Sequence, residues 1–317
     1  MDFFVKRTNE MTGQEQLQLL ELFNKVFDKD RPIEVMLNQY TQNPIGYSYH
    51  SFFMEDGAIK GAITCIPAYY LYRNEQVKIA TIVDAMVAEE NRDLFSFLHV
   101  LNNAYKELKK EGYSFVYCYP NEDAYMVYTK AKSMHEIGRM RTYCLLYRIG
   151  GVKKPLKVMN FLSEGFAWGW VWLAGLLANN KRYEGIIHKE DESYNATRYK
   201  RSDGRYDIVQ IDDFTLYYKI REQEGVRTAF IIDIDKKSAK NFNKSLKYLI
   251  KIESSNFDLI LYPGLLPFSL SGLVPLPRVF ERKKFYMVGK ILDNKIKKED
   301  AFTIMNWDTN LSNYDII

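Results

Sequence analysis

The sequence has few of the residues that build covalent or low-complexity scaffolds. Only 3 cysteines, 9 prolines and 17 glycines occur among its 317 residues. Cys65, Cys118 and Cys144 are too few and too scattered for a disulfide framework, which excludes a small disulfide-stabilised secreted domain and favours a reducing compartment. The low glycine and proline content excludes a collagen-like or low-complexity chain.

No charge of one sign is in excess, and metal-binding spacings are missing. The 44 Lys and Arg face 40 Asp and Glu, a net charge of +4, and aromatic residues make up 15% of the chain without a companion basic stripe. We therefore expect no nucleic-acid partner. The histidines follow no ligand motif, so no metal site is expected; they are His50, His99, His135 and His188.

Only one long apolar run occurs, at 158–178. It carries three tryptophans and is flanked by lysines, but it contains Glu164 and three glycines, which argue against a membrane span. We expect an apolar linker helix within 151–185. Peripheral membrane contact or a homo-oligomer interface through 158–178 stays open as an alternative. Because the N-terminus shows no secretory pattern, we expect a cytoplasmic protein.

The first half alternates between patterns typical of helices and of strands. Apolar spacings of three and four predict helices, β-branched runs predict strands, and Asp56-Gly57 predicts a hairpin turn. The predicted fold is α/β (α+β), a mixed β-sheet flanked by helices. The helices are expected at 12–27, 92–110 and 122–132, and the strands at 51–55, 59–67, 77–87, 115–120 and 141–149.

The second half repeats this order in weaker form. Ile82-Val83-Asp84 recurs as Ile231-Ile232-Asp233, each inside a predicted strand that precedes a predicted helix. Such self-similarity predicts two tandem repeats of one fold. The expected organisation is a first domain at 1–150, the linker helix at 151–185, and a degenerate second domain at 186–317.

A motif after the strand at 115–119 carries a family resemblance. It reads Asn121-x-x-Ala124-x-x-x-Tyr128-x-Lys130, and it follows a long strand at 79–87 and Arg92, which opens the predicted helix. With these features the segment 17–148 resembles the GNAT superfamily of acyl-CoA-dependent N-acyltransferases. It is most similar to a bacterial subset with a second, degenerate GNAT-like half, a subset often associated with cell-surface sugar modification.

The resemblance implies a reaction and its partners. The expected function is direct transfer of an acetyl group from acetyl-CoA to a small-molecule amine, and an amino sugar of a surface polysaccharide is one acceptor that the subset suggests. Backbone groups of Met86, Val87 and Ala88 would pair with the pantetheine amides. The helix near Arg92 would hold the pyrophosphate, and Asn121 would bind the cofactor or hold the strands apart.

Two side chains are expected to carry the chemistry. The resemblance gives Tyr128 the role of protonating the leaving thiolate. Asp84 lies mid-strand, where a carboxylate is costly unless paired, and it would orient or deprotonate the acceptor amine. Structural readings stay open, with Asp84 bonded across strands, Tyr128 packed in the core and Asn121 capping the next helix.

One departure from the family pattern bears on the donor. The family's phosphate loop contains glycines, but residues 91–97 contain none and include Asp93. A carboxylate repels a pyrophosphate, and bulky residues restrict the backbone approach that glycine allows. Two alternatives therefore stay open, a catalytically inactive GNAT-fold binding protein and an acyltransferase that uses a donor other than CoA.

Overall fold

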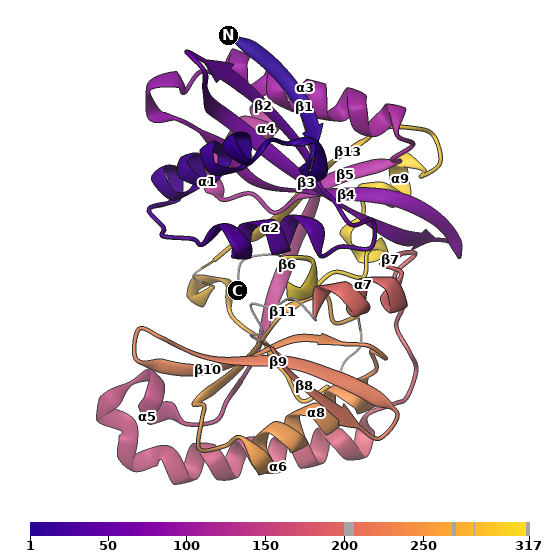
Figure 1. Ribbon diagram of the computed structural model, residues 1–317. Coiled ribbons are helices and arrows are strands. Elements are labelled where there is room, and N and C mark those ends of the chain that lie inside the picture. The colour runs from indigo at the N-terminus through magenta and orange to yellow at the C-terminus, as the bar shows by residue number, and fades with distance from the viewer. Residues whose placement is uncertain (200–205, 268–270, 282, 315–317) are drawn as a thin grey trace. The chain divides into compact units, whose positions relative to one another are not determined.

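The computed structural model describes residues 1–199, 206–267, 271–281 and 283–314 (Figure 1). The chain folds into two compact units, and neither is continuous in sequence. Unit 1 comprises Met1–Arg139, Ile186–Gly204 and Phe285–Trp307, and unit 2 comprises Met140–Gly185, Arg205–Lys284 and Asp308–Ile317.

Unit 1 contains a mixed sheet in the order β1-β2-β3-β4-β5-β13. All neighbours pair antiparallel except β4 and β5, which are parallel. The short strand β7 pairs with the far end of β3. The strands are β1 Asp2–Arg7, β2 Tyr49–Glu55, β3 Ala58–Tyr72, β4 Glu75–Val87, β5 Phe115–Cys118, β7 Ile187–Lys189 and β13 Phe285–Ile291.

Helices cover both faces of this sheet (Figure 1). Side chains of α1 and α2 pack in one core cluster, and those of α3 and α4 pack in another. Thr12 caps α1, because its side chain accepts the Glu15 N–H at 3.2 Å. The helices are α1 Gly13–Phe27, α2 Ile33–Thr41, α3 Leu94–Lys110, α4 Glu122–Lys130, α7 Asp191–Arg198 and α9 Lys298–Ala301, with 3₁₀ turns η1 Thr8–Glu10, η2 Glu89–Asn91 and η5 Ile304–Asn306.

Unit 2 contains strands in the order β6-β11-β10-β9-β8. β6 begins in unit 1 and continues into unit 2. The strands are β6 His135–Leu146, β8 Asp207–Ile211, β9 Phe214–Gln223, β10 Val226–Ile234, β11 Leu259–Gly264 and β12 Val274–Pro275. The helices are α5 Ile149–Val152, α6 Asn160–Leu177 and α8 Ala239–Ile252, with 3₁₀ turns η3 Lys154–Met159, η4 Arg278–Phe280 and η6 Leu311–Asn313.

The two units share an order of elements. In unit 1, β2, β3 and β4 form an antiparallel meander, α3 follows, and β5 returns parallel to β4. In unit 2, β8, β9 and β10 form the meander, α8 follows, and β11 returns parallel to β10. This is the order that the predicted repeat requires.

The predicted mixed sheet flanked by helices is confirmed, but several boundaries differ. The helix expected from Arg92 begins at Leu94, because Asp93 is its N-cap residue. The two compact units do not divide at 150 and 185 as expected, since β13 returns to pair with β5 and β7 returns to pair with β3. The predicted linker helix is α6, and it packs against α8 within unit 2.

Candidate active site

The strands β4 and β5 part near the end of β4. Their parallel pairing covers only Ile79–Phe115, Ala80–Val116 and Thr81–Tyr117. β4 continues to Val87, whereas β5 ends at Cys118. Residues 82–87 of β4 therefore leave an edge that β5 does not pair with, where an extended ligand can add as a strand.

Alternation along β4 decides which backbone groups face this open edge. The Ala88 N–H already donates to the Lys60 carbonyl of the β3 side at 2.7 Å. Successive residues of a strand point their N–H groups to opposite sides, so Met86 shares the direction of Ala88. Of the three residues that the resemblance names, Val87 is the one whose backbone points toward the open edge.

Asp84 lies at a bulge in β4. Ala62 and Thr64 of β3 pair with Met86 and Val83, so two residues of β4 stand opposite one of β3. Asp84 takes the left-handed conformation there, with φ of 48°. Asp is one of the few residues that adopt this conformation readily, and a bulge redirects a side chain out of the regular pleat.

The bulge directs the Asp84 carboxylate toward α2. The Tyr40 hydroxyl donates to Asp84 Oδ2 at 2.7 Å, and Arg31 Nη1 lies 3.6 Å from the same oxygen. Only 9% of the Asp84 side chain is exposed, and these contacts compensate its burial. Burial, and secondarily the Asp84 charge, raise the pKa of Tyr40 well above its usual value, so Tyr40 remains the donor.

Tyr128 is buried on the other face of β4. It packs on α4 in the core cluster of α3, with its ring centroid 5.7 Å from that of Phe97. Burial, and secondarily the neighbouring Cys118, raise its pKa well above the usual value, so the hydroxyl keeps its proton at neutral pH. Asp84 contacts Tyr40 in the cluster of α1 and α2, so the two predicted catalytic side chains lie in different core clusters.

The N-terminus of α3 carries a carboxylate. Asp93 Oδ1 accepts the Ser96 N–H at 2.7 Å, and this hydrogen bond lowers the pKa of Asp93. Arg92 precedes the helix and is exposed. Leu94 and Phe95 of the first turn are exposed apolar side chains. A negative charge and two bulky apolar groups therefore stand where a pyrophosphate would accept N–H bonds.

Asn121 caps α4. Its Oδ1 accepts the Ala124 N–H at 2.8 Å, and the residue is exposed. This is the structural role that the sequence left open beside cofactor binding.

Unit 2 has a corresponding parting of strands. The parallel pairing of β10 and β11 ends at Phe230–Leu261, three residues before Asp233, just as the pairing of β4 and β5 ends at Thr81, three residues before Asp84. β10 also has a register irregularity between Ile231 and Asp233. Asp233 therefore occupies in unit 2 the position that Asp84 occupies in unit 1.

The C-terminal segment 308–313 fills this position in unit 2. Asn310 bridges to Gly264 at the end of β11, and its Nδ2 donates to Asp233 Oδ1 at 2.6 Å. Lys237 Nζ lies 3.0 Å from Asp233 and 2.7 Å from Asp308, and all these groups are buried. The sequence repeat predicts the position of Asp233 but not its partners, because they come from a distant part of the chain.

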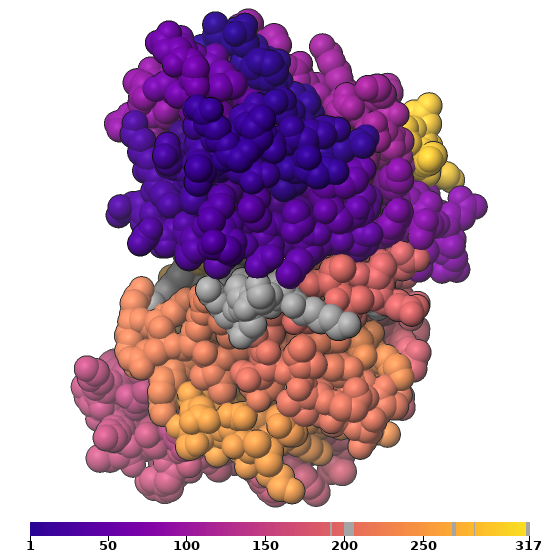
Figure 2. All heavy atoms as spheres, viewed as in Figure 1, coloured from indigo at the N-terminus to yellow at the C-terminus, as the bar shows by residue number. Residues whose placement is uncertain are grey.

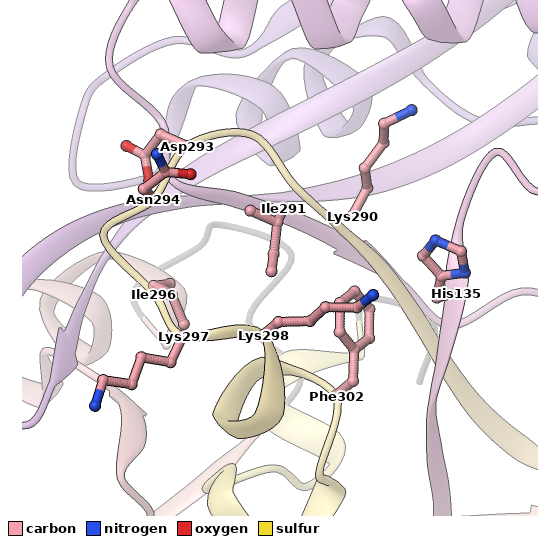
Figure 3. Close-up of a pocket in the computed structure, with 9 residues that line it drawn as sticks. All are labelled: His135, Lys290, Ile291, Asp293, Asn294, Ile296, Lys297, Lys298 and Phe302. Atoms are coloured by element: carbon pink, nitrogen blue, oxygen red, sulfur yellow. The ribbon is translucent and has the colours of Figure 1, made fainter.

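A separate pocket of about 490 Å³ lies in unit 1 beside β13 (Figure 3). Lys290 and Ile291 are neighbours on β13 and point to opposite sides, Ile291 into the hollow. Ile291 pairs with Phe115, the first residue of β5, so the pocket lies at the other end of β5 from the open edge. None of the predicted site residues lines it; its lining is His135, Lys290, Ile291, Asp293, Asn294, Ile296, Lys297, Lys298 and Phe302.

Comparison with solved structures identifies the fold. A conserved protein of unknown function from Enterococcus faecalis V583, described as a probable N-acyltransferase, matches with a TM-score of 0.60 at 12% identity, over 95% of this chain and 74% of that one. The chain has the GNAT fold. A GCN5-related N-acetyltransferase from Anabaena variabilis matches with a TM-score of 0.57 at 10% identity, covering 92% and 73%. Eis1 from Mycobacterium abscessus matches with a TM-score of 0.57 at 9% identity, covering 96% and 76%.

Each GNAT match covers more than nine tenths of this chain and so takes in both units. No family model matches the sequence, and no curated protein matches it. The resemblance read from the sequence is confirmed at the level of the GNAT fold. In the described part of the chain, no three His, Cys, Asp or Glu side chains gather as metal ligands would.

Proposed function

We propose that the protein is an N-acyltransferase whose unit 1 binds an acyl thioester along the open edge of β4. The observation that carries the proposal is the parting of β4 and β5 after Thr81, with Val87 directed toward the gap. The same parting in unit 2 is filled by 308–313, which favours unit 1 as the active half and unit 2 as its degenerate repeat. The GNAT fold supports the reaction class.

The proposed reaction is a direct transfer. The amine nitrogen attacks the thioester carbonyl carbon, a C–N bond forms and the C–S bond breaks. The nitrogen loses one proton to solvent, and the leaving thiolate gains one. Asp84, held by Tyr40 and Arg31, would orient the amine. Tyr128, which burial keeps protonated beside Cys118 at the end of β5, would supply the proton to the thiolate.

Acetyl-CoA is the first candidate donor, and an amino sugar of a surface polysaccharide is the first candidate acceptor. A CoA donor would place the enzyme in the cytoplasm. The open edge suits the pantetheine amides of CoA, but the N-terminus of α3 does not suit its pyrophosphate, since Asp93 occupies it. This mismatch favours a second candidate, an acyltransferase whose thioester donor lacks the CoA nucleotide.

Calorimetric titration with two donors tests the proposal and separates the candidates. Acetyl-CoA and acetyl-pantetheine share the arm that would pair with β4, and only acetyl-CoA carries the pyrophosphate. A Kd of about 100 μM or tighter for either donor is expected. Equal affinities would assign recognition to the pantetheine arm alone, and at least tenfold tighter acetyl-CoA binding would assign a role to the nucleotide.

Two variants of Val87 make the test specific to the open edge. Val87→Pro removes one N–H, which by alternation points away from β3, so pairing with β3 is retained. We expect it to weaken donor binding at least about tenfold, whereas the matched control Val87→Ala should bind like the wild type.

Tyr128→Phe should bind the donor normally but release thiol at least about 100-fold more slowly in the presence of an amine. Absence of donor binding in the wild type would leave a GNAT-fold binding protein without transferase activity.

A further inference from the structure

The outward face of α6 is a continuous apolar surface. Eight of its large apolar side chains are between 48% and 74% exposed, an unusual density for one helix of a folded protein. We call these residues the α6 face. They are Phe161, Leu162, Phe166, Trp168, Trp172, Leu173, Leu176 and Leu177.

The opposite side of α6 is firmly packed. Ala167, Val171 and Ala174 are buried, and Ala167 and Val171 belong to the core cluster of unit 2. Asn243 of α8 donates to the Val171 carbonyl at 2.6 Å, and Trp170 Nε1 donates to the Gly272 carbonyl at 2.9 Å. These contacts fix the orientation of α6, so the α6 face is on the surface of unit 2.

Basic side chains stand at both ends of the α6 face. Residues 153–184 contain five basic and two acidic side chains. The acid within α6, Glu164, already accepts a hydrogen bond from Arg148 Nε at 2.6 Å. The basic residues are exposed and are Lys153, Lys154, Lys157, Lys181 and Arg182.

The neighbouring helix adds to this charge. α8 runs beside α6, and three of its lysines are exposed: Lys240, Lys247 and Lys251. In Figure 2 the surface of α5 and α6 is seen in pink at the lower edge of unit 2, with α8 in orange beside it. An apolar surface is thus bordered by cations along its length as well as at its ends.

We propose that the α6 face docks unit 2 onto a lipid bilayer that contains anionic headgroups, with α6 lying in the plane of the interface. An in-plane helix buries an apolar side rich in Trp, Phe and Leu at the boundary of headgroups and acyl chains, while nearby Lys and Arg contact anionic lipids. Exposed Trp168 and Trp172 suit the headgroup level, where tryptophan is enriched. Among the helices of the described residues, none is long and apolar enough to cross a membrane.

Charge argues for a bilayer over a second copy of the chain. Two α6 helices packed antiparallel would bring Lys153, Lys154 and Lys157 of one copy against Lys181 and Arg182 of the other. In a parallel pair, the basic groups at each end of α6 would lie beside the same basic groups of the other copy. Both arrangements place positive charge against positive charge, whereas an anionic lipid surface complements every basic group around the α6 face.

Vesicle flotation of the full-length protein tests this inference. We expect the protein to float with vesicles of phosphatidylcholine containing about one third phosphatidylglycerol at about 0.1 M salt, and to bind pure phosphatidylcholine at least tenfold more weakly. Binding should fall when salt is raised to about 0.5 M, because the surface charge is then screened. Absence of flotation at low salt, or equal binding to both vesicles at both salt concentrations, would overturn the proposal.

Matched variants locate the contact. The double variant Trp168→Ser/Trp172→Ser changes only exposed side chains, so it should fold normally by circular dichroism and lose at least tenfold in vesicle affinity. Phe95→Ser, a change at a similarly exposed apolar residue of unit 1, should bind vesicles like the wild type. Equal loss in both would contradict a role for α6.

Two further results complete the test. Lys153→Glu/Lys154→Glu/Lys157→Glu should weaken binding to the anionic vesicles by at least about tenfold and leave binding to pure phosphatidylcholine unchanged. Light scattering should find a monomer in the absence of lipid. A dimer that Trp168→Ser/Trp172→Ser dissociates, with no vesicle binding by the wild type, would assign the α6 face to a second copy and overturn the proposal.

Discussion

At the scale of single residues, Asp84 is the side chain on which the proposed amine site depends most. Position 84 needs a residue that tolerates the left-handed backbone conformation. It also needs a side chain that accepts a hydrogen bond from Tyr40 and pairs with Arg31. Asn tolerates the left-handed conformation and its amide oxygen still accepts from Tyr40, but it carries no charge. Ala satisfies neither demand.

We therefore predict different outcomes for two substitutions of Asp84. Asp84→Asn should keep the stability of the wild type to within about 1 kcal/mol and lower amine-dependent thiol release at least about 100-fold. Asp84→Ala should in addition destabilise the fold by about 1–3 kcal/mol, because it adds backbone strain and leaves the buried Tyr40 hydroxyl without its acceptor. Chemical denaturation and a thiol-release assay with a panel of amines measure both effects. Full activity of Asp84→Asn would assign Asp84 a structural role only.

His50 predicts a pH dependence of stability. Its ring is buried between the Thr8 and Thr64 hydroxyls at 2.9 and 3.0 Å, and burial lowers the pKa of His50 to about 3. The unfolded chain takes up this proton near pH 6.5, whereas the folded chain does not. The free energy of unfolding should therefore fall by about 1.4 kcal/mol for each pH unit between about 6 and 3 from this group.

The control for that prediction is His50→Gln, which offers a donor and an acceptor but does not titrate. Denaturation at a series of pH values should show a shallower slope in the variant over this window. The same slope in both proteins would mean that other groups cause the acid sensitivity.

At the scale of elements, the beginning of α3 departs from the glycine-containing phosphate loop of the GNAT pattern, because Asp93 stands there. Asp93→Asn keeps a good N-cap residue and removes the negative charge from the helix N-terminus. We predict that acetyl-CoA then binds about two to five times more tightly, while acetyl-pantetheine binding stays the same. Titration of both donors measures the change. Tighter binding of acetyl-pantetheine as well would show that the effect does not come from the pyrophosphate.

How far the sequence predicts the elements depends on whether the signal is local. The start of α1 at Thr12 and the strands β4 and β5 follow from local spacing and capping chemistry. The partners of Asp84 do not, because Tyr40 lies 44 residues away and depends on how α2 packs on the sheet. The exposed side of α6 could not be predicted from the sequence either, because a helix that is apolar all round has no pattern that distinguishes its buried side from its exposed side.

At the scale of the whole molecule, the two units have the same order of elements, but they differ in what lies beside the corresponding aspartates Asp84 and Asp233. In unit 1 residues 82–87 of β4 extend beyond their pairing with β5, and in unit 2 the segment 308–313 stands against Asp233. Sequence repetition pointed to both aspartates but not to this difference. The return of β13 to β5 was missed for the same reason, because the pairing joins residues that are far apart in the chain.

The buried cluster in unit 2 predicts a large effect on stability. Lys237→Met leaves Asp233 and Asp308 buried without their shared cation, so it should cost about 3–5 kcal/mol. The neighbouring Lys236 pairs with Asp213 at the surface, and Lys236→Met should cost less than about 1 kcal/mol. Denaturant titration of both variants compares them directly. Equal costs would mean that the segment 308–313 is not held by this cluster.

Hydrogen exchange of the wild-type protein tests the central claim most directly. Amide exchange would be followed by mass spectrometry with and without acetyl-pantetheine and acetyl-CoA. We predict slower exchange with donor in peptides that contain residues 82–88 of β4, and no change in peptides from residues 228–234 of β10, where the corresponding edge is filled. Protection of β10 without β4, or no protection in either strand at saturating donor, would contradict the account.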